Sequence, residues 1–527
     1  MTEAISQIAA AGRRAVQSQD WASVAACADE IIRRDAKSAE GYFLGGLVER
    51  IQRHPRKAIE LFQRALELDP ERYDAAVELA NQYSMTRRNA DVAELLARYE
   101  DKLGNSPMYL DLSGTIYTEI GMPEKAWPLF EKAVELQPGV DLFQANLASC
   151  AVFLGKIENA TEVFEHLLGR FPDHQRNHWQ LSRLHKAKDD SHVIQMQEIL
   201  ARKNLPPDHN IYLYYAIGKE FEDLERWDEA FEYYKKAGDS ACSVAEYDVG
   251  TDIAVIDKII EVCDEDWLAA SEIDTVGPEA SQTPVFIVGL PRTGTTLTER
   301  IISSHSQVES LGETQFLQMV LRRESAIESI EMMLPDMIES VARKDMGIIS
   351  RGYMDAAGYR MGDSPFVIDK LPFNFLYLGF IARAWPQARI VSLVRNPMDS
   401  CFSMYKQVFT WAYKFSYSLD YLGPYVVAYQ RLCQHWRELL GDRYIEVVYE
   451  DLVADQENQT RRMLDRLGLD FEDACLNFDK NKAPTATASN VQVREKAHTR
   501  SVHRWKRFEK HLQPLREYLE KAGIVVE

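Results

Sequence analysis

Residues Pro284–Thr298 read Pro-Val-Phe-Ile-Val-Gly-Leu-Pro-Arg-Thr-Gly-Thr-Thr-Leu-Thr, and this stretch decides the fold of the second half of the chain. The apolar run Val285–Val288 predicts a strand that is buried on both faces. A glycine turn follows, and Thr295 begins a predicted helix that continues through Ile301–Ile302. A strand, a glycine turn and a helix in this order point main-chain N–H groups and a helix N-terminus at a phosphate. The stretch therefore predicts a phosphate-binding loop.

The loop differs from that of the nucleotide hydrolases in the position of its cation. Gly289 and Gly294 have the glycine spacing of the hydrolase loop, GxxxxGK[ST]. Thr295 and Thr296 occupy the places of its lysine and hydroxyl residue, and the cation lies inside the loop, at Arg292. We therefore expect a phosphate other than the γ-phosphate of ATP. The alternative is an ordinary strand-to-helix corner that binds nothing.

Composition and charge exclude several classes of protein. Of the 527 residues, 27% are charged and 46% apolar, as in soluble globular proteins, and the length predicts about two to four domains. The net charge of −20 disfavours a nucleic acid as partner. We find neither an apolar window long enough for a membrane span nor a secretory signal. The seven cysteines are scattered without CxxC spacing, which indicates a reducing compartment without disulfides or a metal site, so we expect a cytoplasmic protein.

The first half of the chain is repetitive. The segments that begin at Ala39, Pro107 and Asp141 agree at four positions. The four positions hold a small residue, an alanine, a phenylalanine and a proline, respectively: Gly46, Gly114 and Ala148; Ala58, Ala126 and Ala160; Phe62, Phe130 and Phe164; and Pro70, Pro138 and Pro172. Small residues where two helices meet, an aromatic side chain and a closing proline resemble the tetratricopeptide repeat, whose period is about 34 residues. We predict an all-α solenoid whose units bury their apolar faces against their neighbours.

Other parts of this half fit the repeat less closely. A later unit begins at Ile211, out of phase after an irregular stretch over 186–208, and residues 73–106 are degenerate after Tyr83. Residues before Arg34 predict a capping pair of helices. We place the solenoid at 1–240, with its best units from 39, 107, 141 and 211. Its concave surface would hold a protein or peptide; in the alternative, the array only scaffolds the second half or forms a homodimer.

The repeat period is lost after residue 240. A helical pattern and a linker rich in glycine and proline occupy 241–282. Strand and helix signals alternate over 283–527, which predicts an α/β domain with a parallel sheet. Four apolar runs predict its strands: Phe286–Val288, Phe366–Ile368, Ile390–Val394 and Tyr444–Tyr449. Because ligands of such sheets bind at the carboxyl ends of strands, the residues after each run are candidate site residues.

Polar residues follow the later runs as well as the first. The second run ends in Asp369-Lys370, and the fourth leads into Tyr449-Glu450-Asp451-Leu452. The third ends in Arg395, and Ser403 follows about two helical turns later. An arginine at a strand end and a serine on the next helix can contact one phosphate from two sides.

These motifs together resemble one enzyme family. Pro-Arg-Thr-Gly-Thr-Thr, Leu-Gly-Glu-Thr, Asp-Lys-x-Pro, Val-Arg-Asn-Pro-x5-Ser and Tyr-Glu-Asp-Leu, in this order, resemble the sulfotransferases that use 3′-phosphoadenosine 5′-phosphosulfate (PAPS). The resemblance covers residues 283–510 and leans toward the tyrosylprotein sulfotransferases and the bacterial enzymes that join this domain to tetratricopeptide repeats. It implies a P-loop-like α/β sulfotransferase domain that moves sulfonate from PAPS to a hydroxyl acceptor and releases 3′-phosphoadenosine 5′-phosphate (PAP). Cationic side chains would replace a metal in this in-line transfer.

The resemblance also implies a role for individual residues. The loop Arg292-Thr293-Gly294-Thr295-Thr296 would bind the 5′-phosphosulfate, with Arg292 neutralising charge on the bridging oxygen. Arg395 and Ser403 would bind the 3′-phosphate. Glu313, in Leu-Gly-Glu-Thr, would take the proton of the acceptor hydroxyl. Lys370 would contact the transferring sulfonate and the leaving phosphate.

A basic run near the C-terminus adds candidate nucleotide contacts. Residues 494–510 are rich in arginine and lysine, which in an acidic chain predicts a flap over the polyanionic nucleotide. Ser489, Arg494 and Arg504 are the candidate cofactor-binding residues there. The alternative is a solvated amphipathic helix.

Several alternatives remain for the base, the pocket and the class of protein. His435 is a second candidate base, because cytosolic small-molecule sulfotransferases use a histidine. The aromatic stretch Phe409–Tyr429 forms either core or the acceptor pocket. In a P-loop nucleotide kinase Asp369 would hold magnesium, although the missing loop lysine argues against this class. A non-catalytic repeat scaffold is the remaining class.

A protein or peptide tyrosine is the acceptor that we expect. The motifs lean toward the tyrosylprotein branch, and a solenoid could hold a polypeptide. Animal tyrosylprotein sulfotransferases differ in being membrane proteins of the secretory pathway. Sulfation of a glycan, lipid or small metabolite, with the repeats as scaffold, is the alternative.

Overall fold

The computed structural model describes residues 3–104, 106–270, 282–329, 331–409, 412–481, 483–485, 487 and 492–526. The chain divides into two compact units, Met1–Leu154 and Gly155–Glu527. The described part of the first unit is helical, and the second contains further helices and a five-stranded sheet. The predicted fold class, helical repeats followed by an α/β domain with a parallel sheet, is confirmed.

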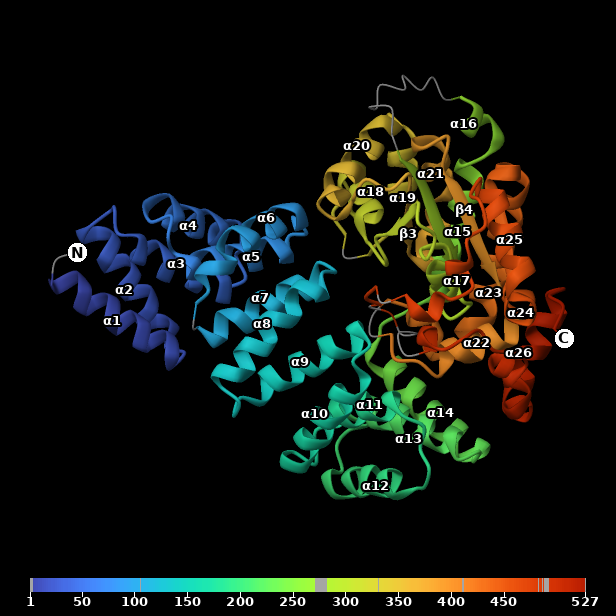
Figure 1. Cartoon of the computed structure of the whole chain (residues 1–527), viewed down its shortest axis with the longest axis horizontal. Helices are drawn as coiled ribbons and strands as arrows, with labels where there is room; N and C mark the ends of the chain where they lie inside the picture. The colour runs from blue at the N-terminus through green and yellow to red at the C-terminus, as the bar shows by residue number, and fades with distance from the viewer. Residues whose placement is uncertain are drawn as a thin grey trace. The chain divides into compact units, whose positions relative to one another are not determined.

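The first unit is a row of helices that pack on their neighbours along the chain, except that α7 packs on α5 and not on α6 (Figure 1). They are α1 (Glu3–Gln17), α2 (Trp21–Arg34), α3 (Ala39–Ile51), α4 (Pro55–Leu68), α5 (Tyr73–Met85), α6 (Asn89–Tyr99), α7 (Pro107–Glu119), α8 (Pro123–Leu136) and α9 (Asp141–Leu154). From α3 to α9, each odd-numbered helix begins 34 residues after the one before. The predicted capping pair corresponds to α1 and α2.

The small and aromatic residues of the repeat meet as its pattern predicts. A Cβ atom on Gly46 would lie 2.5 Å from the Phe62 ring, and one on Gly114 would lie 2.8 Å from the Phe130 ring. Each glycine therefore lets an aromatic ring of the next helix rest on its backbone. The close packing of the two helices in each pair therefore requires a small residue on the first helix and permits an aromatic residue opposite it on the second, 16 residues later.

Two segments are more regular than the sequence predicts. Residues 73–106 contain a complete helix pair, because α5 keeps small buried residues while α6 buries Leu96 and Tyr99 in place of the usual phenylalanine. The stretch predicted to be irregular, 186–208, contains α12 (Ser191–Lys203), which buries Val193, Met196 and Ile199. In both cases the helix keeps an apolar face without the residue identities of the repeat.

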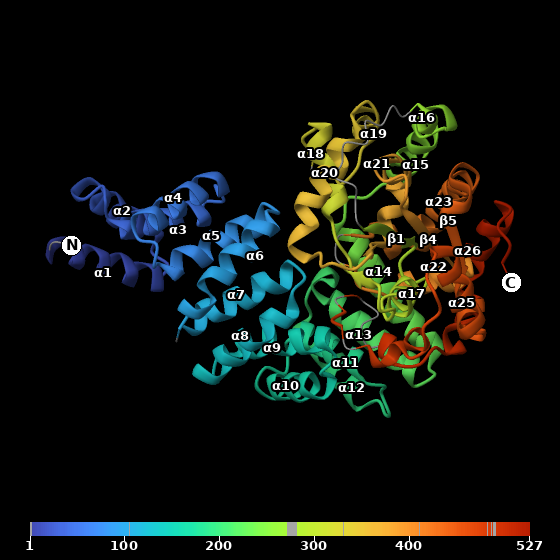
Figure 2. The same ribbon diagram turned by 45° about the horizontal axis from the view of Figure 1, so that its top comes forward.

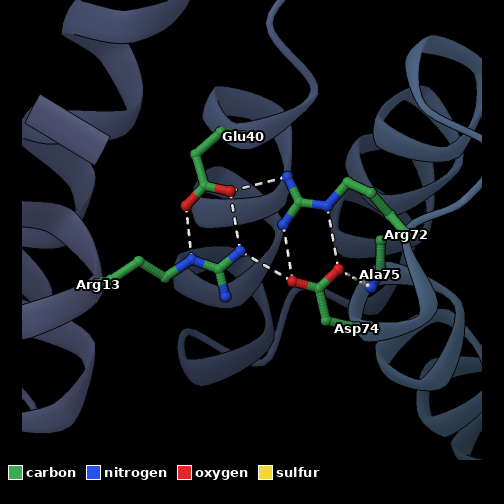
Figure 3. A network of polar contacts seen from close by, with 5 residues as sticks. All are labelled: Arg13, Glu40, Arg72, Asp74 and Ala75. Atoms are coloured by element: carbon green, nitrogen blue, oxygen red, sulfur yellow. Dashed lines mark hydrogen bonds and ion pairs between the residues drawn. The ribbon is translucent and has the colours of Figure 1, made fainter. Parts of the chain in front are cut away.

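Two arginines and two carboxylates connect three helices of the first unit (Figure 3). Arg13 of α1 donates to Glu40 of α3 at 2.5 and 2.8 Å and to Asp74 of α5 at 2.8 Å. Arg72 donates to Glu40 at 2.8 Å and to Asp74 at 2.7 Å. Both guanidinium groups lie over the ring of Phe43, 4.4 and 4.5 Å from its centre. Each charge therefore has an opposite partner, and the network lines a pocket of this unit.

The second unit begins with further helices of the array, followed by two helices in the stretch predicted as helix and linker, 241–282. They are α10 (Ile157–Arg170), α11 (Gln175–Leu184), α12, α13 (Ile211–Asp223), α14 (Trp227–Val244), α15 (Val249–Val262) and α16 (Glu265–Ala269). In the predicted unit from Ile211, a Cβ atom on Gly218 would lie 2.8 Å from the Tyr234 ring, as in the earlier repeats. We place the domain boundary at residue 240, where the repeat period ends, and it stays a prediction. The division of the chain into two compact units falls earlier, after Leu154, so α10–α14 belong to the same unit as the sheet.

The sheet consists of parallel strands in the order β2-β3-β1-β4-β5. The strands are β1 (Thr283–Gly289), β2 (Val308–Ser310), β3 (Phe366–Lys370), β4 (Arg389–Val394) and β5 (Tyr444–Val448). Four of them lie on the predicted apolar runs. The sequence missed β2, because it has three residues, two of them half-exposed, and gives no apolar run.

Helices cover both faces of this sheet (Figure 2). They are α17 (Thr295–Ile302), α18 (Phe316–Ser325), α19 (Pro335–Ala342), α20 (Met346–Ala357), α21 (Leu378–Ala384), α22 (Pro397–Tyr405), α23 (Leu419–Leu440), α24 (Tyr449–Ala454), α25 (Gln456–Leu467) and α26 (Glu509–Lys521). Val285 and Ile287 of β1 face a core with α17, α24 and α25, whereas Phe286 and Val288 face a core with α15, α18–α21 and α23. None of the helices in the described residues has both the length and the apolar character to cross a bilayer.

The charge network of the first unit predicts an acid-sensitive stability. Burial alone would raise the pKa of Asp74, but Arg72 and Arg13 reverse this and hold it below 3.8. Because the folded pKa is depressed, the stabilisation is present above the unfolded pKa and is lost as the pH falls through the folded value. We expect Asp74→Asn to lower the free energy of unfolding of α3 and α5 by about 1.5–3 kcal/mol at neutral pH, and by less in acid. Amide hydrogen exchange of these two helices, followed at increasing urea concentrations, measures this free energy of unfolding.

Arg98→Ala is the matched control for this prediction. Arg98 and Glu94 form an ion pair with 63% and 72% of their side chains exposed, so its loss should change the same free energy by about 0.5 kcal/mol or less. Equal effects of the two substitutions would show that the network contributes no more than a surface pair.

Candidate functional site

The order of the strands brings the predicted site residues to one edge of the sheet. The strand β1 lies between β3 and β4, and all three are parallel. Their carboxyl ends carry the loop 290–294, Lys370 and Arg395. In α/β folds a ligand usually binds at the carboxyl ends of the central strands, where the connections after neighbouring strands run to opposite sides of the sheet.

The loop after β1 has a backbone that few residue types allow. Gly289 and Gly294 have φ angles of 148° and 104°, and Arg292 between them has a φ angle of 68°. A Cβ atom on Gly294 would lie 2.6 Å from the ring of Tyr449. The loop is closed by the hydroxyl of Thr293, which donates to the Leu290 carbonyl at 2.7 Å. The turn thus requires both glycines, and the close approach of Tyr449 is a second requirement at Gly294.

The helix α17 begins directly after this loop. Thr295 and Thr296 are its first residues and are buried, and the Thr296 hydroxyl lies 3.4 Å from that of Thr487. The first main-chain N–H groups of a helix have no acceptor within the helix. Together with the positive end of the helix dipole they favour an anion at this position.

Arg395 contacts the same loop from β4. It donates through Nη1 to the Arg292 carbonyl at 2.7 Å, and its guanidinium lies 4.6 Å from the centre of the Tyr449 ring. Its Nε is buried and has no hydrogen-bond partner within the part of the chain that the structure describes. Burial, followed by the positive charges of Arg395 and Arg183, lowers the pKa of Arg292 to about 10. Such mutual repulsion between cations is relieved by an anion.

Ser403 lies on the helix that follows Arg395. The helix α22 begins with Pro397, and the Asn396 side chain caps it by accepting from the N–H groups of Met398 and Asp399 at 3.0 and 3.2 Å. Ser403 is half-buried in the last turn of α22. The structure therefore fixes Arg395 and Ser403 on two adjoining elements.

The C-terminal basic segment is attached to this corner. The buried carboxylate of Asp399 accepts from the N–H groups of His503 and Trp505 at 2.6 and 2.9 Å. Arg395 donates through Nη2 to the Ser501 carbonyl at 2.7 Å. The segment thus runs beside the loop residues, and its local structure includes the short 3₁₀ helices Thr499–Ser501 and Arg504–Phe508, followed by α26. That it covers a nucleotide stays a prediction.

The three candidate residues of this segment have different surroundings. Arg504 donates through Nε to Glu222 of α13 at 2.6 Å. Arg494 packs its guanidinium against Gly155, where an added Cβ atom would lie 2.1 Å from Cζ. Ser489 lies outside the described residues.

Glu313 and Lys370 form a close ion pair. Lys370 is the last residue of β3 and is fully buried, and its Nζ donates to Glu313 at 2.6 Å and lies 3.5 Å from Glu299. Burial opposes its charge, but the two carboxylates outweigh this effect and raise the pKa of Lys370. The Glu313 side chain is 33% exposed, so the pair combines a buried cation with a carboxylate that solvent reaches.

Asp369 occupies a different environment from its neighbour. Its buried carboxylate accepts from the hydroxyls of Thr314 and Tyr353 at 2.6 and 2.8 Å and from the Asn374 amide at 3.1 Å. Burial raises the pKa of Asp369 to about 6, against the effect of these hydrogen bonds. A carboxylate enclosed by three protein donors is poorly placed to bind magnesium, which argues against the kinase alternative.

The alternative base and the aromatic stretch lie in the helical core. His435 is on α23, and its Nε2 bonds the Cys263 carbonyl at 2.9 Å. Phe415 and Tyr425 are buried and stack with their ring centres 3.7 Å apart. Tyr413, in contrast, is half-buried and near enough to Glu313 for that charge to add to burial in raising its pKa. The stretch is therefore mostly core, with Tyr413 at the edge nearest the candidate base; Trp411 lies outside the described residues.

Sequence analysis missed several residues of this site. Glu299 lies on α17, where its spacing from the loop gives no signal. Tyr449 was noted only as part of a motif, although its ring contacts both Gly294 and Arg395. Lys406 follows Ser403 by three residues, a helical spacing that could have identified it. Glu222, on a repeat helix, could not be connected to this half of the chain from the sequence.

The resemblance predicted from the motifs is confirmed by comparison with known proteins. Residues 284–473 match the model of the sulfotransferase family. An "uncharacterized protein" of Aquifex aeolicus (strain VF5) is 28% identical over 440 residues, which cover 82% of this chain and 57% of that protein. Protein-tyrosine sulfotransferase 1 of Danio rerio is 25% identical over 220 residues, covering 40% of this chain and 60% of that enzyme.

Solved structures match parts of both halves. The sulfotransferase domain of the Synechococcus PCC 7002 olefin synthase is 22% identical with a TM-score of 0.33, covering 44% of this chain and 90% of that domain. The tetratricopeptide repeat protein YrrB is 16% identical with a TM-score of 0.28, covering 40% of this chain and 91% of that protein. This chain spans less than two thirds of the length of the two sequence relatives.

Proposed function

We propose that this chain, whose residues 284–473 match the sulfotransferase family, transfers sulfonate from PAPS to a hydroxyl acceptor. The observation that carries the proposal is the meeting, at one edge of the sheet, of a phosphate-type loop, the cations Arg292 and Arg395, and the Glu313–Lys370 pair. A loop of this kind alone would suit many phosphorylated ligands. The adjoining carboxylate and buried lysine are what a transfer to a hydroxyl group requires.

The donor set fits an adenosine nucleotide that carries phosphates at both ends. The N–H groups of Thr295 and Thr296 and the side chain of Arg292 would hold the 5′-phosphosulfate. Arg395, whose buried Nε has no partner in the described residues, and Ser403 would hold the 3′-phosphate. PAPS supplies the activated sulfonate when bound. Arg494, Arg504 and Ser489 remain proposals for the nucleotide flap, and Ser489 lies outside the described residues.

Glu313 is the base that we propose. It is within hydrogen-bond distance of Lys370 and is partly exposed, so an acceptor hydroxyl can reach its carboxylate and transfer a proton to a carboxylate oxygen. Lys370, held in its protonated form, would stabilise the negative charge that the leaving phosphate gains. With Arg292, it would place two positive charges near the reacting group, the function that magnesium serves in phosphoryl transfer.

Tyrosine of a protein or peptide is the acceptor that we favour. Protein-tyrosine sulfotransferases of Danio rerio and Drosophila melanogaster are among the relatives. The half-buried Tyr413 lies near Glu313 and packs edge-on against Phe373 and Phe409, with ring centres 4.5 and 4.8 Å apart, which gives a partly aromatic wall beside the base. The repeats of the first unit would hold the polypeptide. A cytoplasmic location and a homodimer stay predictions.

An acceptor other than a polypeptide is the second candidate. The charge network of Arg13, Glu40, Arg72 and Asp74 lines a pocket of the first unit and pairs these charges with one another, which is what a structural scaffold requires. In that case a glycan, lipid or small metabolite would accept the sulfonate, and the repeats would contribute only structure.

Removal of Arg395 tests the donor assignment. We expect Arg395→Ala to weaken binding of PAP to the full-length protein by about 10- to 100-fold, because a charge-assisted hydrogen bond to the 3′-phosphate is lost. ADP lacks that phosphate, so its binding should change little. Titration calorimetry with PAP and with ADP measures the affinity of the wild type and of the variant for each nucleotide. An equal loss of affinity for both nucleotides would refute the 3′-phosphate assignment.

Neutralisation of Glu313 tests the base. Glu313→Gln keeps the size of the side chain and should leave PAP affinity within about twofold, while the rate of sulfonate transfer should fall by about 100-fold or more, as expected when a general base is lost. Single-turnover transfer from radiolabelled PAPS measures this rate. His435→Gln is the matched control and should transfer at the wild-type rate; the opposite pattern would make His435 the base.

A further inference from the structure

A buried carboxylate of the repeat array lies against two cations of the second half of the same compact unit. Glu222, in the last turn of α13, is 4% exposed. One of its oxygens accepts from Lys406 Nζ and from Arg504 Nε, each at 2.6 Å, and the other accepts from the Tyr234 hydroxyl at 2.7 Å. Burial alone would raise the pKa of Glu222, but Lys406 and Arg504 reverse this and lower it to about 2.

The helices that carry Glu222 and Tyr234 pack directly on α22. The Tyr234 ring meets Phe402 edge-on with ring centres 6.2 Å apart, and the Phe231 ring stacks on Tyr405 at 5.9 Å. The Tyr215 hydroxyl donates to the Tyr405 carbonyl at 3.3 Å. The helix that carries Ser403 is therefore held between the sheet and the last helix pair of the array, and Glu222 has a fixed position relative to it.

Lys406 lies within the group of cations at the candidate donor site. It follows Ser403 by three residues, directly after the end of α22, and 22% of its side chain is exposed. Burial lowers the pKa of Lys406 to about 8 against the opposing effect of Glu222, and the charges of Arg504 and Arg292 lower it further. Arg504 is 38% exposed, so both cations can reach solvent while each keeps its bond to Glu222.

One carboxylate between two cations leaves one positive charge in excess, because Asp223, the other carboxylate that acts on Arg504, is itself paired with Lys219 at 2.6 Å. Arg395, attached to the same segment through the Ser501 carbonyl, and Arg292 add further positive charge nearby. A simple structural bridge would need only one cation for Glu222. The excess of partly exposed cations beside Ser403 is the arrangement that binds a phosphate group.

We propose that Lys406 is a further ligand of the 3′-phosphate of the donor, and that Glu222 of the repeat array is the positioning residue that holds Lys406 and Arg504 for it. The inference rests on the proposed function and names the repeat helices α13 and α14 as a structural part of the donor site. Glu222 acts through the two cations and does not itself contact the phosphate.

Substitution of Lys406 in the full-length protein tests the assignment. We expect Lys406→Gln to weaken PAP binding by about 10- to 100-fold and ADP binding by less than about twofold, because only PAP carries the 3′-phosphate. Lys406→Arg keeps the charge and should restore most of the preference for PAP. Lys510→Gln is the matched control, since Lys510 also connects the C-terminal segment to α14, through Asp228 at 2.6 Å, and should leave the preference unchanged.

Glu222→Gln separates positioning from charge. Removal of a negative charge beside a phosphate site should by itself strengthen PAP binding; loss of positioning should weaken it by about threefold to tenfold and leave ADP unchanged. A stronger binding of PAP to Glu222→Gln would refute the positioning role.

The wild-type protein distinguishes failure of this inference from failure of the proposed function. A wild-type preference for PAP over ADP that persists in Lys406→Gln would overturn the Lys406 assignment alone. A wild type without that preference would overturn the 3′-phosphate donor as well.

Discussion

Buried positive charge is the constraint on which the site depends. Lys370 is fully enclosed at the end of β3, and Arg292 is held in a strained loop beside Arg395. Burying a cation is costly unless an opposite charge compensates it. Glu313 and Glu299 compensate Lys370, whereas the positive charges of Arg395 and Arg183 oppose that of Arg292. An anion at this edge of the sheet would relieve the repulsion between Arg292 and its neighbouring cations, and the nucleotide that we propose, with phosphates at both ends, would supply it.

The sheet order and the repeat array together create this concentration of charge. Placing β1 between β3 and β4 brings three strand ends to one edge, and Asp399 attaches the C-terminal segment to the same corner. The helices α13 and α14 then pack on α22 and contribute Glu222. The repeats near the sheet and those of the first unit accordingly have different surroundings: the former adjoin the candidate donor site, whereas the latter carry a self-compensated charge network.

The parts of the fold that follow from local patterns could be predicted from the sequence. The loop after β1 and the repeat spacing both follow from short-range rules on apolar runs, glycines and small-to-aromatic pairs. The short strand β2 could not be predicted, since a three-residue edge strand has no periodicity. The Glu222–Lys406 contact joins residues 184 positions apart, and no local rule connects them. The pairing of Glu313 with Lys370 likewise required the register of the strands, although the motifs had named both residues.

The most direct test of the account is transfer of radiolabelled sulfonate from PAPS by the full-length protein into an extract of its source organism, separated by size and by protease treatment. The account predicts label in protease-sensitive material, recovered as sulfotyrosine, with an amount near background for Glu313→Gln. Label confined to small, protease-resistant products would keep the enzyme a sulfotransferase and exclude tyrosine as the acceptor. Absence of any transfer above the background of a reaction without the protein would contradict the central claim.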